Sequence, residues 1–370
     1  MHGHRCSLHP VPSSENIHAS SPLSTSVFVR PENPLDAVRW NDLISPHLNA
    51  SIFHQTAWAK VLADTYGFTP VYLASFAGEK LSGALPLMEV DSWLTGKRGV
   101  SLPFTDECES LVFSGESGAA LVQEALKTGR TRGWKYLELR GGKDFFNAPK
   151  PSLAFYGHKL NLTATTERLF NQFESSVRRA LRKANQSGLR VEFSQTLEAT
   201  AAYYSLHCAT RKEHGLPPQP FKFFRSIQEH ILGKNLGIIA TAKFQERPVA
   251  SAVYFFQGAA AVYKFGASLK TALDARANNL VMWQAIQWLA ARGIKELKFG
   301  RTSLHHEGLR RYKLGWGTEE YPINYYKYDF GTGALVSERD ASSGWHNSLF
   351  RALPLPVSKS IGRLLYKHVA

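Results

Sequence analysis

The sequence lacks the short motifs that identify several large classes of enzyme. It contains no HExxH, GxSxG, GxxxxGK[ST] or CxxC, so the usual signatures of metalloproteases, hydrolases and P-loop proteins are missing. Only three cysteines occur, Cys6, Cys108 and Cys208, and this odd, widely spaced set argues against a disulfide framework and fits a reducing compartment. No apolar run approaches the roughly 18 residues that cross a bilayer, so we expect a soluble protein or one peripheral to a membrane.

Acidic residues are scarce relative to basic ones. The 370-residue chain carries 44 Lys and Arg against 30 Asp and Glu, a formal net charge of +14. Such a charge suits polyanionic partners, namely RNA, phosphorylated substrates or anionic lipid headgroups, although it also serves solubility alone. The composition is otherwise globular, and the length accommodates two domains of ordinary size.

A motif that occurs twice organises the chain. Residues 119–141 read AALVQEALKTGRTRGWKYLELRG, and residues 277–300 read ANNLVMWQAIQWLAARGIKELKFG. Each copy has a helical pattern that ends at a glycine and is followed by a short alternating strand. Similar hairpin-like segments precede the copies at 79–87 and 246–254. The repetition predicts an internal duplication of an α/β unit, with mixed sheets flanked by helices.

The expected organisation follows from the repeat and from local composition. We expect a disordered leader over 1–26, because serine, proline and histidine dominate it. Two α/β domains are predicted over 27–162 and 163–335, and a basic amphipathic tail over 336–370.

Two predicted helices carry clustered positive charge. A helix over 167–187 groups Arg178, Arg179, Arg182 and Lys183 within one and a half turns, which indicates either a contact with an RNA backbone or a solvated basic face. In the tail, Ile361, Leu364 and Leu365 form an apolar face beside basic residues. That pattern is typical of a helix at an anionic membrane, or of a terminal helix docked on the body.

The segment GRTSLHHEGLRRYKLGWG at 300–317 is the strongest candidate for chemistry. It directly follows the second repeat strand, and strand ends in α/β sheets are common ligand sites. Lys313 lies between Tyr312 and a Gly-Trp-Gly turn, where its ammonium would stabilise an oxyanion or bind a phosphate, unless the loop is simply solvated. His305 and His306 are weaker candidates for general bases. Arg211 and Lys212 precede a proline-rich loop and either reach the same cleft or form a solvated helix end.

Several segments, in this order, resemble the FemAB-related family. They are FHQTAWAKVL, GALPLMEV, SLPFTDE, RRALRKANQSGLRV, HGLPPQPFKFF and KFGRTSLHHEGLRRYKLGWGTEEYPINYY, between about residues 40 and 330. The resemblance implies two tandem domains of the acyltransferase superfamily called GNAT. The tail FRALPLPVSKSIGRLLY further resembles members associated with exosortase and exopolysaccharide gene clusters.

The resemblance also implies a reaction and a set of residues. Better-known members transfer an amino acid from aminoacyl-tRNA to an amine of a peptidoglycan precursor. Lys313 occupies the position of a lysine important for transfer, and Asp106 that of an acidic residue suggested to deprotonate the amine. The implied substrate-binding residues are Arg301, Ser303, Tyr312, Trp316, Arg211 and Lys212. The family often has a lysine where this chain has Leu62, with Lys60 two residues earlier, so the chain departs from the pattern for a muramyl-phosphate contact.

We therefore expect a cytoplasmic N-acyltransferase, either free or peripheral on the inner face of the membrane, that uses aminoacyl-tRNA as co-substrate and needs no cofactor or metal. Its acceptor would be a phosphorylated or lipid-linked glycan precursor. The closest alternative is an acyl-CoA-dependent GNAT acetyltransferase acting on a polysaccharide precursor; Gly266 lies far from the next helix start and no GxG follows it, which disfavours CoA. A second alternative is a non-catalytic, membrane-associated binding module of polysaccharide export.

Overall fold

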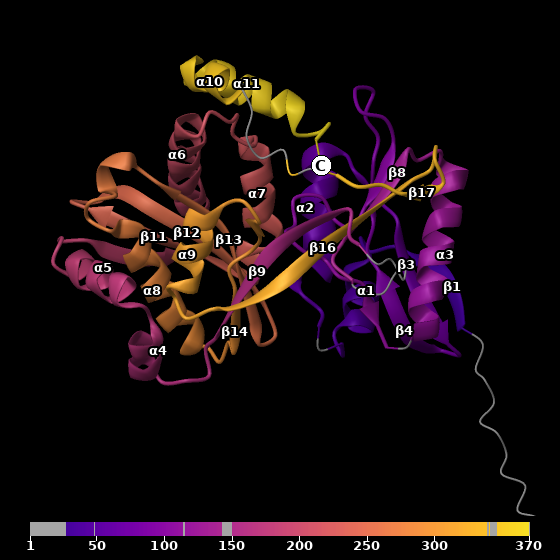
Figure 1. The fold of residues 1–370 in the computed structure, drawn as a ribbon, viewed down its shortest axis with the longest axis horizontal. Coiled ribbons are helices and arrows are strands. Elements are labelled where there is room, and N and C mark those ends of the chain that lie inside the picture. The colour runs from indigo at the N-terminus through magenta and orange to yellow at the C-terminus, as the bar shows by residue number, and fades with distance from the viewer. Residues whose placement is uncertain are drawn as a thin grey trace, which may run out of the picture.

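The computed structural model describes residues 27–369 except 48, 114, 143–149, 339 and 341–345. The leader predicted over 1–26 and part of the predicted tail lie outside the described residues. Within those residues the strands form a four-stranded sheet in the order β1-β3-β4-β7 and a thirteen-stranded sheet. The larger sheet follows the path β10-β11-β12-β13-β14-β9-β16-β8-β6-β5-β2, with β15 beside β9 and β17 beside β16. It runs through both halves of the molecule (Figure 1).

The strands of the first half are β1 (Val27–Glu32), β2 (Thr69–Pro70), β3 (Tyr72–Ala77), β4 (Lys80–Leu85), β5 (Met88–Val90), β6 (Arg98–Val100), β7 (Leu111–Val112), β8 (Tyr136–Arg140) and β9 (Leu153–Asn161). Those that follow are β10 (Arg190–Ser194), β11 (Gly237–Phe244), β12 (Arg247–Gln257), β13 (Ala260–Ser268), β14 (Glu296–Lys298), β15 (Thr302–Ser303), β16 (Glu319–Asp329) and β17 (Ala334–Leu335).

The α-helices are α1 (Ala37–Ile44), α2 (Thr56–Tyr66), α3 (Gly115–Arg132), α4 (Thr166–Gln172), α5 (Ser175–Asn185), α6 (Leu197–Glu213), α7 (Phe221–His230), α8 (Ala277–Ala290), α9 (Glu307–Leu314), α10 (His346–Ala352) and α11 (Leu355–Leu365). Short 3₁₀ turns lie at Ile52–His54, Leu232–Lys234 and Lys270–Ala272. No helix of the described part of the chain is long and apolar enough to cross a membrane.

The predicted α/β architecture is confirmed, and the two repeat copies form equivalent elements. The first copy forms α3 and β8, and the second forms α8 and β14. Gly133 and Gly293, which follow the two helices, both have left-handed backbone angles, with φ of 70° and 78°. Each repeat strand then pairs in parallel with an earlier strand, β8 with β6 and β14 with β13.

Two central strands join the halves. β9 pairs with β14 at its carboxyl end and with β16 along its length. β16 pairs with β9 through Glu319–Tyr325 and then with β8 through Tyr325–Asp329. It therefore crosses from the sheet of the second half into that of the first, as the long diagonal strand in Figure 1 shows.

An apolar core also crosses between the halves. Trp58 on α2 is fully buried, and its ring centroid lies 6.0 Å from that of Phe223 on α7 and 6.0 Å from that of Phe255 on β12. A second core lies between the sheet of the second half and helices α5 and α8, with Trp283 and Trp316 among its buried residues. The halves are thus fused by side chains as well as by strands.

The helix predicted over 167–187 is wrong as a single element. It divides into α4 and α5 at Phe173, whose ψ of 147° is extended. The Phe173 ring is buried against Trp283 and Trp316, and the next amide, of Glu174, donates to the carbonyl of Gly315. Core packing therefore outweighs the local helical pattern at this point.

The C-terminal helix is docked on the body along one face. α11 lies beside α6, and its half-buried Ile361 and Leu365 differ from Leu364, which is 60% exposed. The three residues therefore do not form a single apolar face, and of the two alternatives left open by the sequence, the structure has the terminal helix docked on the body. Past the helix, the Tyr366 hydroxyl accepts a hydrogen bond from Arg211 Nη2 at 2.7 Å, and the chain ends between the halves (Figure 1).

Candidate functional site

A strained turn after β6 carries the predicted acidic residue. Leu102 and Phe104 have φ of 58° and 61°, a left-handed conformation that is costly for residues with a side chain. Two cations, the buried Arg140 and the partly buried Lys264, hold the turn. Arg140 on β8 donates to the carbonyls of Leu102 and Thr105, and Lys264 on β13 donates to the carbonyl of Phe104 at 2.5 Å. The turn therefore fixes the position of Asp106, its last residue.

Asp106 lies against the turn that follows β14. A Cβ atom on Gly300 would come within 2.5 Å of Asp106 Oδ2, and Gly300 has a φ of +72°. The positive φ favours glycine here, and a Cβ atom would also displace the Asp106 carboxylate. The next residue, Arg301, places its Nε 3.8 Å from Asp106 Oδ1, so the two predicted residues form a loose ion pair across the halves.

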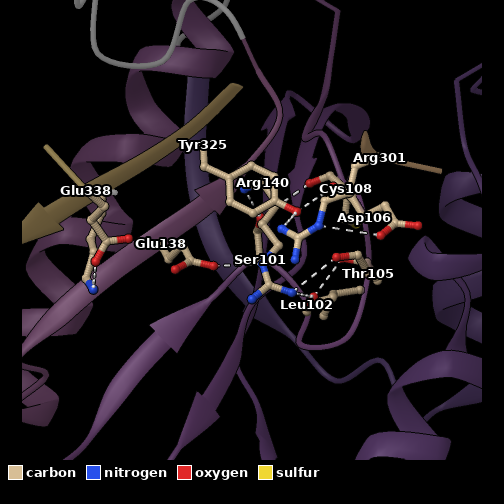
Figure 2. Close-up of polar contacts among 11 residues, drawn as sticks. Ser101, Leu102, Thr105, Asp106, Cys108, Glu138, Arg140, Arg301, Tyr325 and Glu338 are labelled. Carbon is tan, nitrogen blue, oxygen red and sulfur yellow. Dashed lines mark hydrogen bonds and ion pairs between the residues drawn. The ribbon is translucent and has the colours of Figure 1, made fainter. Parts of the chain in front are cut away.

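Tyr325 of the crossing strand β16 completes this network (Figure 2). Its hydroxyl donates to the backbone carbonyl of Asp106 at 2.6 Å and accepts from Arg301 Nη1 at 2.9 Å. The Arg301 guanidinium also lies over the Phe155 ring, 4.4 Å from its centroid. Burial raises the pKa of Tyr325 to about 12, so its hydroxyl stays protonated and available as a donor.

Lys313 reaches this turn from the other side, from helix α9. Its Nζ donates to the carbonyls of Gly300 at 2.8 Å and Arg301 at 3.0 Å, and the residue is only 4% exposed. An ammonium has three N–H donors, so one remains for a bound group. Burial lowers the pKa of Lys313 to about 8, and the nearby Asp106 carboxylate partly opposes that shift.

A buried histidine lies close to Lys313. His158 on β9 is fully buried, and neither ring nitrogen has a hydrogen-bond partner among the described residues. Burial lowers the pKa of His158 to about 4, with the positive charge of Lys313 as the second cause. The ring is therefore neutral at physiological pH and leaves Lys313 as the charged member of the pair.

A cavity of about 220 Å³ opens beside Asp106 and Gly300. Its wall includes four carboxylates, Asp106, Glu107, Glu109 and Glu296, and a single lysine, Lys298, which is paired with Glu107. The Tyr321 hydroxyl also donates to Glu107 at 3.0 Å. An acidic cavity in a chain of net charge +14 provides an environment that favours a cation.

A basic groove of about 620 Å³ lies on the opposite, helical side of the same sheet. Arg179 and Lys183 of α5, Arg276 at the start of α8 and Arg311 of α9 line it, with Glu174 as the acidic member. No side chain caps the amino terminus of α8, so its first backbone N–H groups add to the positive potential there. The groove has the charge and donors to bind phosphates.

α9 and the Gly300 turn lie between the two openings, and Lys313 itself lines neither of them. Tyr312 lines the groove, the adjacent Lys313 bonds to Gly300, and Gly300 lines the cavity. β13 and β14 pair only from Ala260–Val262 and then separate, which leaves an interruption in the sheet at this level. The arrangement suits a reaction between a phosphate-bearing molecule on one side and a cationic molecule on the other.

The other predicted residues lie at varied distances from this centre. Ser303, in β15, accepts a hydrogen bond from the backbone N–H of His305, and His306 caps α9. Trp316 is completely buried in the second core, so any influence on binding would be indirect. Arg211 bonds to Tyr366 and to the carbonyl of Pro217. Neither Arg211 nor the exposed Lys212 lines the cavity or the groove.

Sequence reasoning missed Lys264, Arg140, Tyr325 and the carboxylates that follow Asp106. Lys264 lies in the segment AVYKFGAS, which has the pattern of a strand. A charged residue within such a strand was the sequence feature that could have identified it. Burial lowers its pKa, while Asp106 acts in the opposite direction. The pairing of Tyr325 with Asp106 and Arg301 depends on the crossing of β16, which no local pattern indicates. Within the described residues, no three His, Cys, Asp or Glu side chains are arranged so that they could hold a metal ion.

A model of a known protein family matches part of the chain that contains this site. Residues 171–322 match the family model described as an acetyltransferase (GNAT) domain. That span includes every residue of the basic groove as well as Lys313. No curated protein sequence matches the chain.

Solved structures extend the likeness over most of the chain. The structure of FemX aligns with a TM-score of 0.66 at 14% identity, covering 82% of this chain and 98% of FemX. A tandem GNAT protein from the clavulanic acid biosynthesis pathway gives 0.51 at 12% identity, covering 85% and 100%. L-PGS from Bacillus licheniformis gives 0.53 at 12% identity, covering 90% and 97%. The predicted tandem GNAT-like fold is thus confirmed, and the acetyltransferase (GNAT) domain matched over residues 171–322 supports an acyltransferase activity.

Proposed function

We propose that this acyltransferase moves an aminoacyl group from aminoacyl-tRNA to an amine of a cell-envelope or exopolysaccharide precursor. One observation carries the proposal: a basic groove and an acidic cavity lie on opposite sides of one sheet, with Lys313 and the Gly300 carbonyl to which it is bonded between them. The groove suits a donor rich in phosphate, and the cavity suits an acceptor that arrives as an ammonium ion. The proposed site includes Lys313 and Asp106, with no cofactor or metal assigned to it.

The make-up of the groove favours RNA as the donor. Arg276 lies at the start of α8. A pyrophosphate, such as that of CoA, could approach the backbone closely at this point only if the residue were glycine. Gly266 lies inside β13 with its Cα beside the Tyr263 hydroxyl, away from the helix start. Long basic side chains such as Arg179 and Lys183 suit phosphates spread along a backbone. That the structural neighbours include FemX and L-PGS is in keeping with this choice.

The proposed reaction balances with the side chains present. The acceptor amine, after losing its ammonium proton to solvent, attacks the ester carbonyl of the donor, and a C–N bond forms while the carbonyl oxygen becomes negative. The free N–H of Lys313 stabilises that oxyanion. Asp106 accepts the second proton from the nitrogen and returns it to the ribose oxygen as the ester C–O bond breaks. The products are an amide and a deacylated tRNA.

The donor groove provides the experiment that tests this proposal. Binding of a fluorescent aminoacyl-tRNA analogue, with a stable amide link, is measured across a salt series for the wild type and for Arg179→Gln/Lys183→Gln. If both side chains neutralise phosphates, the slope of log K against log salt falls by about 1.4 to 1.8, because each contact contributes about 0.7 to 0.9. Arg168→Gln/Arg182→Gln is the matched control, because neither residue lines the groove.

The same assay distinguishes the acetyltransferase alternative, which the match to an acetyltransferase domain supports. Acetyl-CoA that binds tightly and competes with the analogue, together with an unchanged salt slope in Arg179→Gln/Lys183→Gln, would overturn RNA as the donor. Transfer to amino-sugar and diamine acceptors is then measured with the donor that binds. Failure of both donors to bind would favour a non-catalytic binding module.

A further inference from the structure

The loop between β5 and β6 exposes an unusual pair of apolar side chains. Trp93 is 84% exposed and Leu94 is 53% exposed at the tip of this hairpin. Exposed tryptophan is common where proteins meet the interface of a lipid bilayer, because its ring is apolar and its N–H prefers water. An isolated exposed residue would need no explanation, but this pair has neighbours of the same kind.

The end of the chain lies directly beside this loop. The His368 ring is 5.5 Å from the Trp93 ring, and its Nδ1 is 2.9 Å from Ser92 Oγ. The buried guanidinium of Arg98 donates to the His368 carbonyl at 2.7 Å, and Thr95 donates to the same oxygen. The last turn of the chain is therefore fixed to the hairpin, although the two segments are 270 residues apart in sequence.

The tail segment that leads into this junction adds further exposed apolar residues and two positive charges. Leu364 is 60% exposed and Val369 is 48% exposed. Arg363 and Lys367 of the same segment are also exposed. Figure 1 shows α10 and α11 lying along one side of the molecule, with the chain end at the junction of the halves. We call Trp93, Leu94, Arg363, Leu364, Lys367 and Val369 the hairpin–tail surface.

We propose that the hairpin–tail surface binds the surface of an anionic lipid bilayer. Apolar side chains with interleaved lysine and arginine match the boundary between acyl chains and negative headgroups. The described residues from 346 to 369 include no Asp or Glu, so the positive charge of the tail is not offset within that segment. The surface is built from a hairpin of the first half and from the C-terminal tail, which distinguishes it from an amphipathic tail helix acting alone. It does not depend on the donor or on transfer chemistry.

Vesicle co-sedimentation of the full chain tests this surface without any donor or acceptor. Vesicles of phosphatidylcholine are compared with vesicles that also contain phosphatidylglycerol. We expect the wild type to bind the anionic vesicles, and Trp93→Ala/Leu94→Ala or Arg363→Gln/Lys367→Gln to bind them roughly tenfold or more weakly. Phe244→Ala, which removes an exposed ring of another hairpin, and Arg292→Gln/Lys295→Gln, in the turn between α8 and β14, are the matched controls.

The outcomes divide cleanly. Loss of binding in the two surface variants alone, with melting temperatures equal to that of the wild type, supports the proposal. Equal losses in the control variants would show that general charge or hydrophobicity drives binding, and would overturn it. A wild type that does not bind anionic vesicles would also overturn it, and would assign the exposed tryptophan to a protein partner. None of these results depends on which donor the enzyme uses.

Discussion

Lys313 is held by two backbone carbonyls and has a pKa of about 8, so its charge changes within an accessible pH range. In the proposed reaction the ammonium form is the active one. Because the pKa in the folded protein is lowered from its usual value, the ammonium is present below pH 8 and is lost as the pH rises through about 8. Transfer activity should therefore fall on the alkaline side.

Two variants at this residue give the first prediction. Lys313→Ala should lower kcat/KM by about 10²- to 10³-fold, the usual cost of removing one donor to an oxyanion. Lys313→Arg should retain part of the activity and lose the alkaline decline near pH 8, because a guanidinium stays charged. Both effects are measured by pH–rate profiles of kcat/KM. Wild-type rates in Lys313→Ala, or an unmoved alkaline decline in Lys313→Arg, would contradict the assigned role.

Single residues also show what a sequence pattern can and cannot predict. The motif around Lys313 predicted residues that lie together in the structure, namely the Gly300 turn, Arg301 and Asp106. Lys264 was missed, since its importance comes from the Phe104 carbonyl that it binds, 160 residues away in sequence. A partly buried lysine has no recognisable local signature when its partner is a backbone atom of another element.

At the scale of elements, docking of the C-terminal helix depends on a close contact at Gly362. This residue faces the Pro217–Pro218 segment, and a Cβ atom there would overlap the Pro218 carbonyl oxygen. α11 thus packs against the predicted proline-rich loop. Neither segment indicates this contact in its own sequence. Local patterns predicted the loop and the helix, but not their contact.

Gly362→Ala is therefore expected to loosen α11 from the body. Overpacking of this kind costs about 1–3 kcal/mol, and here that cost should weaken helix docking while the core of each half remains intact. Limited proteolysis should cut the tail faster in this variant than in the wild type. Ser360→Ala, on the exposed side of the same helix, is the control. Equal cleavage rates in Gly362→Ala and wild type would show that the contact does not hold the helix.

At the scale of the whole molecule, the shared sheet and the core around Trp58 make the halves interdependent. Trp58 belongs to the first half, yet its neighbours Phe223 and Phe255 belong to the second. The duplicated motif predicted two similar units. It gave no sign that β9 and β16 would join them into one sheet, because strand pairing between distant segments depends on the three-dimensional packing of both.

Trp58→Ala should therefore destabilise both halves together. Removing a buried tryptophan costs about 3–5 kcal/mol. Amides of α8 that exchange only through global unfolding, far from Trp58 in the sequence, should exchange roughly 10²- to 10³-fold faster. Hydrogen exchange followed by mass spectrometry measures this. Faster exchange confined to the first half would show that the halves unfold separately.

The path of β16 also bears on how the protein is made. During synthesis the first half leaves the ribosome well before Tyr325–Asp329, the residues that pair with β8. In the sheet, β16 lies between β8 and β9. It is therefore made only after almost the entire second half has been translated. Until then the outer side of β8 has an open edge, and such edges invite pairing with other chains. The nascent first half is consequently the stage at which this protein is most exposed to aggregation and most in need of a chaperone.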